Sequence, residues 1–332
     1  MSEYIDRFSR PLKTAASSIN LNQHTAKTNG LAKEELDVEP NHRYYKQRVY
    51  WKDLLHYKTW EIFKELLLPL PWLVLAIAAS YQSAQSNLAI ENYSLQNQII
   101  SWHFSYWTVI TIIASFYFFL TGLRVTHNAF HYCLGLSRWA TDIVMFVLSW
   151  LMLGSLHAIQ YTHLQHHRHC LGDDDIEGSV AKQGFWEALF KGPLFPFLIH
   201  REAIRKANKK TQRWIVAELS MNIAWVIAVW FWFEADALVI ALRIHILLMM
   251  IAYALSAFFA VWTVHHNTEN NQSEVAYWDN SRTMRSRWKS VLFFNMFYHI
   301  EHHLFPQIPT CHLPELAKRL DLAGYHTHKL VI

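Results

Sequence analysis

Three histidine clusters supply the residues most able to do chemistry. The pattern H-x-x-H-H occurs twice, at residues 163–167 and 299–303, and the looser pattern H-x-x-x-H occurs at residues 127–131. On a helix, residues three and four positions apart share one face, so each cluster presents two or three imidazoles to a single point. Imidazole is a ligand for iron, zinc, copper and nickel, so we interpret the clusters as metal boxes. The box histidines are His127, His131, His163, His166, His167, His299, His302 and His303.

The number of histidines favours two metal ions over one. A tetrahedral zinc needs only four ligands, and the boxes alone offer twice that number. A ninth ligand is available at His265 or His266, where the last long apolar run ends; we favour His266, with His265 as the alternative. Further candidates, as ligands or as hydrogen-bond partners that orient the imidazoles, are Asn295, Asp173, Asp174, Asp175, Glu177, Asn128, Asp142, Asn267 and Glu301. Among the acidic residues that follow the second box we name Asp174 and Asp175.

Composition points to a membrane protein rich in helix. Of 332 residues, 52% are hydrophobic and 15% aromatic, and only nine are glycine. The net charge is only +4, and no run of Lys and Arg alternates with aromatic residues in the way that nucleic-acid grooves require, so nucleic acid is excluded as a partner. The three cysteines form no C-x-x-C motif, which argues against a disulfide framework and a zinc ribbon.

Four apolar runs approach or exceed the roughly 20 residues that a crossing of the bilayer requires. The predicted spans are residues 66–81, 102–123, 214–233 and 237–264. Two other apolar segments, residues 143–156 and 185–199, are too short or too interrupted by proline to span, and we predict that they are interfacial or re-entrant helices. With four crossings, all three boxes lie on the same side of the membrane as the N-terminus.

The distribution of basic residues predicts the orientation. Residues 201–213 carry six Lys or Arg and residues 282–289 carry four, whereas the links 82–101 and 234–236 carry none. By the positive-inside rule, the boxes and both termini are cytoplasmic, in a bacterial inner membrane or a membrane of the endoplasmic reticulum type. Residues 42–64, rich in Tyr, Trp, Lys and Arg, are expected to lie on the membrane surface.

We therefore expect an all-α integral membrane fold in three parts. Residues 1–40 form a flexible polar arm, residues 41–325 form the membrane domain, and residues 326–332 form a short tail. Polar side chains inside the spans are costly in lipid, so Glu218, Asn222 and His245 should face the helix bundle, while Arg243 should reach toward an interface.

The three boxes, H-N-A-F-H, H-L-Q-H-H and H-I-E-H-H, resemble those of the integral-membrane fatty acid desaturase family, as do the string N-x-x-x-H-I-E-H-H-L-F-P at residues 295–306 and the order of the apolar runs. The resemblance covers roughly residues 60–320. It implies that the eight box histidines and either His265 or His266 hold two ferrous ions in a cytoplasmic His-rich cap. It also implies that O2 is the co-substrate and that the product is a double bond in a long acyl chain.

The same resemblance leaves other activities open. A di-iron lipid hydroxylase or a carotenoid ketolase or hydroxylase would use the same boxes; the Leu-Phe-Pro after the third box favours the acyl substrate. A non-catalytic metal-binding or transport protein is a more remote alternative, because a transporter places its ligands near the middle of the membrane.

We expect electrons to come from a separate donor, of the ferredoxin, rubredoxin or cytochrome b5 type, with its reductase. The sequence shows no haem-binding H-P-G-G box and no Cys-rich iron–sulfur segment that could serve as an internal donor. The basic stretches 201–213 and 282–289 are candidate docking surfaces for an acidic donor, although the positive-inside rule explains them equally well.

Overall fold

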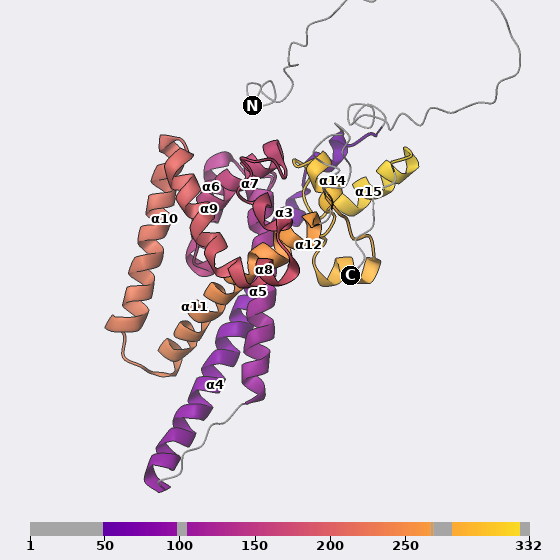
Figure 1. Cartoon of the computed structure of the whole chain (residues 1–332). Coiled ribbons are helices and arrows are strands. Elements are labelled where there is room, and N and C mark those ends of the chain that lie inside the picture. The colour runs from indigo at the N-terminus through magenta and orange to yellow at the C-terminus, as the bar shows by residue number, and fades with distance from the viewer. Residues whose placement is uncertain (1–48, 98–104, 267, 269–280, 326–332) are drawn as a thin grey trace, which may run out of the picture. The chain divides into compact units, whose positions relative to one another are not determined.

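The computed structural model describes residues 49–97, 105–266, 268 and 281–325, all within one compact unit of residues 40–332. The elements among these residues are helices, without a β-strand (Figure 1). The α-helices are α3 Thr59–Leu67, α4 Leu70–Asn97, α5 Tyr106–Phe130, α6 Arg138–Met152, α7 Leu156–His169, α8 Phe185–Lys191, α9 Phe195–Lys206, α10 Lys209–Ile227, α11 Ala237–Ser256, α12 Thr263–His265, α13 Arg287–Leu292, α14 His299–Leu304 and α15 Leu313–Leu322. Short 3-10 helices are η1 Lys52–Leu55, η2 Gly178–Lys182 and η3 Gly192–Leu194, and the π-helical turns are η4 Ala228–Trp232 and η5 Ala257–Trp262. The predicted arm and tail, residues 1–40 and 326–332, lie outside the described residues.

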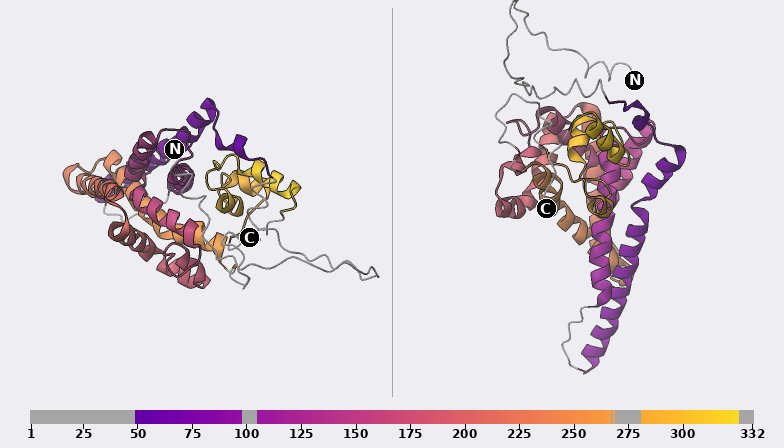
Figure 2. Two further views of the ribbon diagram at one scale, coloured as in Figure 1. Left: turned by 90° about the horizontal axis from the view of Figure 1, so that it is seen from above. Right: turned by 90° about the vertical axis from the view of Figure 1, so that its right-hand side faces the viewer.

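Four helical segments are long and apolar enough to cross a membrane, as many as the sequence predicted. They are Thr59–Ala89, Tyr106–Phe130, Lys209–Trp232 and Ala237–His265. The α4 and α5 helices run side by side over most of their length, and α11 packs against α4 (Figures 1 and 2). Between the spans and the histidine-bearing helices lies a core that includes Phe118, Phe130, Met145, Leu156 and Met249. The spans therefore form the scaffold on which the boxes are mounted.

The α4 helix is longer than the apolar run that predicted it. The run ends at Tyr81, but α4 continues to Asn97 through residues that we expected to form most of the link to the next span. No glycine or proline interrupts residues 82–97, and hydrogen bonds between Ser83 and Thr108 and between Ser80 and Thr111 tie this part of α4 to α5. The polar residues of this segment therefore remain helical and lengthen the pair that α4 forms with α5.

The segment between the first and second boxes turns sharply. Helices α6 and α7 meet at an angle of 110°. By length and composition they form either one broken span or a re-entrant segment. The sequence predicted the re-entrant segment. Leu153 at the bend adopts a left-handed conformation with φ of 60°, and a Cβ on the adjacent Gly154 would collide with Tyr253. Ser155 then caps α7 by accepting a hydrogen bond from the backbone N–H of Ala158. The bend thus starts the helix that carries the second box.

The polar residues within the spans find partners in the bundle. Glu218 on α10 is fully buried, and its carboxylate contacts His157 Nδ1 at 2.7 Å and accepts a hydrogen bond from Ser155. The Arg243 guanidinium donates to the carbonyl oxygens of Val229 and Trp230 in the π-helical turn η4. Arg243 therefore satisfies backbone carbonyls of the neighbouring span, a role that the sequence pattern did not suggest.

Candidate metal centre

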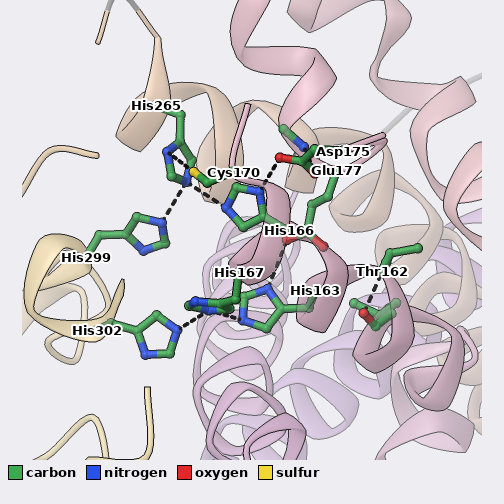
Figure 3. A network of polar contacts seen from close by, with 12 residues as sticks. Thr162, His163, His166, His167, Cys170, Asp175, Glu177, His265, His299 and His302 are labelled. Atoms are coloured by element: carbon green, nitrogen blue, oxygen red, sulfur yellow. Dashed lines mark hydrogen bonds and ion pairs between the residues drawn. The ribbon is translucent and has the colours of Figure 1, made fainter. Parts of the chain in front are cut away.

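The candidate ligands lie on or directly after four helices that the chain brings together. His127 lies in the last turn of α5 and His131 directly follows it, the second box lies on α7, and the third lies on α14. His265 is the last residue of α12, which continues the fourth span. Figure 3 shows the side chains from α7, α12 and α14 directed toward one another. Residues up to 176 positions apart in the sequence thus share one site, since 303 − 127 = 176.

One group of histidines gathers around the second box and α5. His127, His131, His163 and His302 offer ligand nitrogens that all lie within 4.8 Å of one another. His167 joins them, because its Nε2 lies 3.1 Å from Nε2 of His163 and 2.8 Å from Nε2 of His302. We call these five residues group one.

A second group lies beside the first. His166, His265 and His303 offer ligand atoms within 4.8 Å of one another, together with the thiol of Cys170. His299 belongs here too, with its Nε2 at 2.8 Å from Nε2 of His265 and 3.0 Å from Nε2 of His303. The four histidines form group two.

The two groups are neighbours. The ring centroids of His167 in group one and His303 in group two are 4.4 Å apart, and those of His163 and His166 are 6.2 Å apart. Residues of each H-x-x-H-H box divide between the groups, since the second and third boxes each contribute to both. The arrangement suits two metal ions held close together.

Two buried carboxylates fix the direction in which the imidazoles present their lone pairs. Asp175 Oδ2 lies 2.7 Å from Nδ1 of His166, and Glu177 Oε1 lies 3.0 Å from Nδ1 of His163 (Figure 3). A carboxylate accepts a hydrogen bond from Nδ1–H, which leaves Nε2 unprotonated and able to bind a metal. Both carboxylates are almost completely buried, so solvent competes little for these contacts.

The contacts between Nε2 atoms are the best test of whether the residues fit a metal. His166 Nε2 faces His265 Nε2 at 3.1 Å, although the proton of His166 is drawn to the opposite ring nitrogen by Asp175. Lone pairs at such a distance repel unless a proton or a cation lies between them. In addition, Nδ1 of His127 and Nδ1 of His303 are buried without a hydrogen-bond partner in the described part of the chain. This donor set matches what cations of the first transition row require.

Burial keeps the third box in the form that binds metal. It lowers the pKa of His299, His302 and His303 well below the usual value, and the neighbouring imidazoles lower the pKa of each further. The physical cause is that a buried imidazolium loses its hydration and repels other positive charge nearby. These histidines are therefore neutral at physiological pH, as metal ligation requires.

The structure brings His265 into the cluster and leaves His266 outside both groups. His265 is fully buried, and its Nδ1 side faces Cys170 and Ser281 while its Nε2 faces group two. His266 instead pairs through Nδ1 with the carbonyl oxygen of Ala181 and stacks on Trp262, with ring centroids 4.3 Å apart. We therefore propose His265 as the ninth ligand, the reverse of the preference for His266 that the sequence suggested.

The remaining candidates divide sharply. Asp175 and Glu177 contact box histidines, whereas Asp174 and Asp173 are exposed in the turn before them. Asn295 is half-buried in a turn and has a left-handed backbone conformation with φ of 62°, and its part in metal binding stays a prediction. Asn267 lies outside the described residues. Asp142 contacts the Tyr132 hydroxyl at 2.9 Å and belongs to the buried network around His157 rather than to either group.

A buried polar network behind the first box was not anticipated. The Arg124 guanidinium makes two hydrogen bonds to Glu65, at 2.7 and 2.6 Å. Asn128, the residue after His127, donates to Glu65 and accepts hydrogen bonds from the backbone and hydroxyl of Thr310. The network joins α3, α5 and the segment after the third box. The sequence suggested Asn128 as a partner of the imidazoles, but its amide bonds Glu65 and Thr310 instead.

Glu301, within the third box, points away from the histidines. Its carboxylate accepts hydrogen bonds from the Thr283 hydroxyl at 2.6 Å and from Arg285 Nε at 2.9 Å. Burial raises the pKa of Glu301, while Arg285 opposes that shift. The contacts anchor α14 to the preceding segment and so hold the third box in place.

Comparison with known proteins agrees with this geometry. A family model described as fatty acid desaturase matches residues 101–331, well over half of the chain, and the match includes every histidine of both groups. A comparison with curated proteins gives no match. With three histidine boxes assembled into two adjacent groups and the family match running through all of them, the chain belongs to the fatty acid desaturase family, whose members are di-iron oxidoreductases.

Proposed function

We propose that the protein is a membrane-bound, O2-dependent fatty acyl desaturase that introduces a double bond into a long acyl chain. The observation that carries this proposal is the convergence of nine imidazoles into two adjacent groups, in a chain whose family match includes all nine. Five imidazoles in one group and four in the other exceed the needs of a single metal ion.

In this proposal, each group holds one iron ion. Group one, centred on His163, would hold the first, and group two, centred on His265, would hold the second. When bound, the iron pair would supply the oxidising chemistry that uses O2 to remove hydrogen from an unactivated C–H bond. Cys170 lies beside Nδ1 of His265, on the opposite side of the ring from Nε2, so we assign it as a neighbour of the ligand and not as a ligand.

The protein's own residues orient the ligands and exclude water. Asp175 and Glu177 hold protons on Nδ1 of His166 and His163, so that Nε2 of each ring is aimed into the site. Six of the nine histidines are buried, and the other three, His127, His131 and His167, are partly exposed. A site of this kind fixes coordination while keeping bulk water away from the reacting carbons.

The electrons come from a separate donor in this proposal. Desaturation removes two hydrogen atoms from the acyl chain and reduces O2 to two water molecules, so two further electrons and two protons must be supplied. A ferredoxin, a rubredoxin or a cytochrome b5, with its reductase, fits this need. The basic residues between 201 and 213 support a cytoplasmic location for the site, and they would attract an acidic donor.

The experiment that tests the activity is mass spectrometry of total lipids from cells that express the protein. We compare the wild-type chain with His166→Ala, in which a group-two histidine is removed, and with His169→Ala, which removes an exposed histidine from the same helix. A product lighter by two hydrogen atoms, present with the wild type and His169→Ala and absent with His166→Ala, establishes desaturation. A product heavier by one oxygen atom would make the protein a hydroxylase of the same site.

Metal content separates the enzyme from a metal-binding protein without activity. We expect two tightly held irons per chain in the wild type and fewer in His166→Ala. Labile zinc, lost on brief exposure to a chelator, would refute the di-iron assignment and favour a metal-handling protein.

A further inference from the structure

The short helix α13 exposes its large apolar residues. Trp288, Val291 and Leu292 are 84%, 66% and 50% exposed, whereas Ser290 between them is 4% exposed. A helix on the surface of a water-soluble domain buries its apolar residues and exposes its polar ones. In α13 the small polar residue faces the protein and the large apolar ones face outward, which is the pattern expected where the surroundings are lipid.

The contacts of the segment that follows α13 show its depth. The backbone carbonyl oxygen of Phe294 accepts a hydrogen bond from Arg124 on α5, and the Phe294 ring meets the Tyr117 ring edge-on at 6.1 Å. Both partners belong to the span Tyr106–Phe130. The turn that begins directly after α13 therefore lies against a membrane-spanning helix.

The position of the membrane along α5 follows from the distribution of charged residues in this helix. Residues 106–123 contain no Asp, Glu, Lys or Arg, and they extend for about 27 Å at 1.5 Å per residue, close to the roughly 30 Å thickness of the hydrocarbon layer. Arg124 is the first charged residue beyond this stretch. Tyr117 lies seven positions before it, or about 10 Å deeper. Phe294 thus packs at the level where α5 enters the hydrocarbon.

We infer that the Trp288, Val291 and Leu292 face of α13 is inserted into the boundary layer of the phospholipid bilayer. Tryptophan is favoured at this depth, where its ring is apolar and its N–H can meet the headgroups. Lys289, exposed between Trp288 and Ser290, has an aliphatic stem that can lie along an apolar surface. The occupant of this face is the lipid bilayer.

Helix α8 presents a second outward-facing apolar surface beside a span. Helix α8 exposes Phe185, Trp186 and Phe190, and the adjoining Gly192 packs directly against the backbone of Ala254 in the fourth span. We expected the α8 segment to be interfacial from its sequence, and α13 adds an interfacial element that the sequence did not indicate.

This assignment changes the role of the basic residues around α13. The sequence suggested that residues 282–289 form part of a docking surface for the electron donor, but a face inserted into lipid is closed to a soluble partner. Because α13 leads into α14, which begins at His299, the bilayer reaches the protein beside the third box. Nothing in this surface depends on which metal the histidines hold.

The test uses the full-length protein in nanodiscs of phosphatidylcholine and phosphatidylglycerol. A nitroxide is attached in turn to Trp288→Cys, Val291→Cys and Leu292→Cys, with Cys311→Ser to remove the one native cysteine that is not buried. Leu322→Cys on α15, whose native side chain is 89% exposed, is the matched control. Collision rates with O2, which concentrates in lipid, and with a water-soluble nickel chelate report the depth of each label.

We expect the ratio of O2 to nickel collisions to be several-fold higher at the three α13 positions than at position 322. A ratio equal to that of the control would place α13 in water and overturn the inference. Labels shielded from both reagents would show that protein covers α13, which would overturn it as well. Three separate positions guard against the failure of any one variant to fold.

Discussion

Replacing Asp175 with Asn tests how strongly a buried carboxylate supports the metal centre. Asp175 accepts three hydrogen bonds: from His166 Nδ1 at 2.7 Å and Leu171 N at 2.9 Å to Oδ2, and from Gly178 N at 2.8 Å to Oδ1. An asparagine has nearly the same shape but only one acceptor oxygen. If that oxygen takes the place of Oδ2, the amide nitrogen faces the Gly178 N–H, and two donors oppose each other.

The size of the expected loss in iron affinity follows from these contacts. Leaving one buried backbone N–H unpaired costs about 1–3 kcal/mol. The bond to His166 also loses its charge assistance, which makes it roughly half as strong. Loss of a partner that orients a ligand typically lowers metal affinity about 10–100-fold, equivalent to about 1.4–2.7 kcal/mol. We therefore expect Asp175→Asn to lower the affinity of group two for its iron by a factor in this range, and to leave the iron in group one in place.

The assay is a chelator titration of purified protein with iron counted per chain. Asp174→Asn is the matched control, because Asp174 is exposed and its replacement makes the same chemical change one residue away. We expect the control to follow the wild type, while Asp175→Asn releases one of two irons at a chelator activity about 10–100-fold lower. Identical titration curves for the two variants would refute the reasoning. Circular dichroism at each step shows whether release accompanies unfolding.

Three further outcomes are expected. His265→Ala should lose one iron per chain while His266→Ala retains both, because only His265 faces group two; equal losses in the same titration would contradict this assignment. Arg124→Gln should lower the free energy of unfolding by about 3–5 kcal/mol, because it leaves Glu65 buried without its cation, and thermal unfolding in detergent measures it. An unchanged unfolding midpoint would count against the pairing. Metal-free protein should lose stability as the pH falls below about 6.5, because burial holds the pKa of the third-box histidines below the usual value and the unfolded chain therefore binds protons first. A midpoint that stays constant or rises on acidification would exclude this explanation.

The four spans were predictable because the membrane imposes a simple requirement. A segment that crosses lipid must be apolar over about 20 residues, and that requirement is written locally in the sequence. The ends of the spans were less predictable. The α4 helix continues to Asn97 through a polar segment, because its interactions with α5 and the absence of helix breakers decide its length, and neither is visible in hydropathy.

The box histidines were predictable for a similar reason. Spacings of three and four place imidazoles on one face of a helix, and the sequence displays those spacings directly. The choice between His265 and His266 was different, because adjacent residues differ by about 100° in direction around a helix. Only the packing of α12 against η2 and the clusters determines which of the two turns inward.

The sequence also could not tell which carboxylates contact the box histidines. Asp173, Asp174, Asp175 and Glu177 are alike in composition, but the turn after α7 exposes the first two and buries the last two against histidines. The pairing of Glu65 with Arg124 joins residues 59 positions apart, and that of Glu218 with His157 joins residues 61 apart. No local pattern specifies a partner at such separations.

The sequence by itself determined the membrane class, the four segments apolar enough to span and the histidine boxes, because each depends on composition or on spacing within a single helix. Tertiary structure alone decided how the histidines divide between two groups, which residue joins them as the ninth, which carboxylates orient the rings, and that α13 turns its apolar residues outward. These features depend on contacts between residues far apart in the chain, and such contacts exist only once the helices have packed.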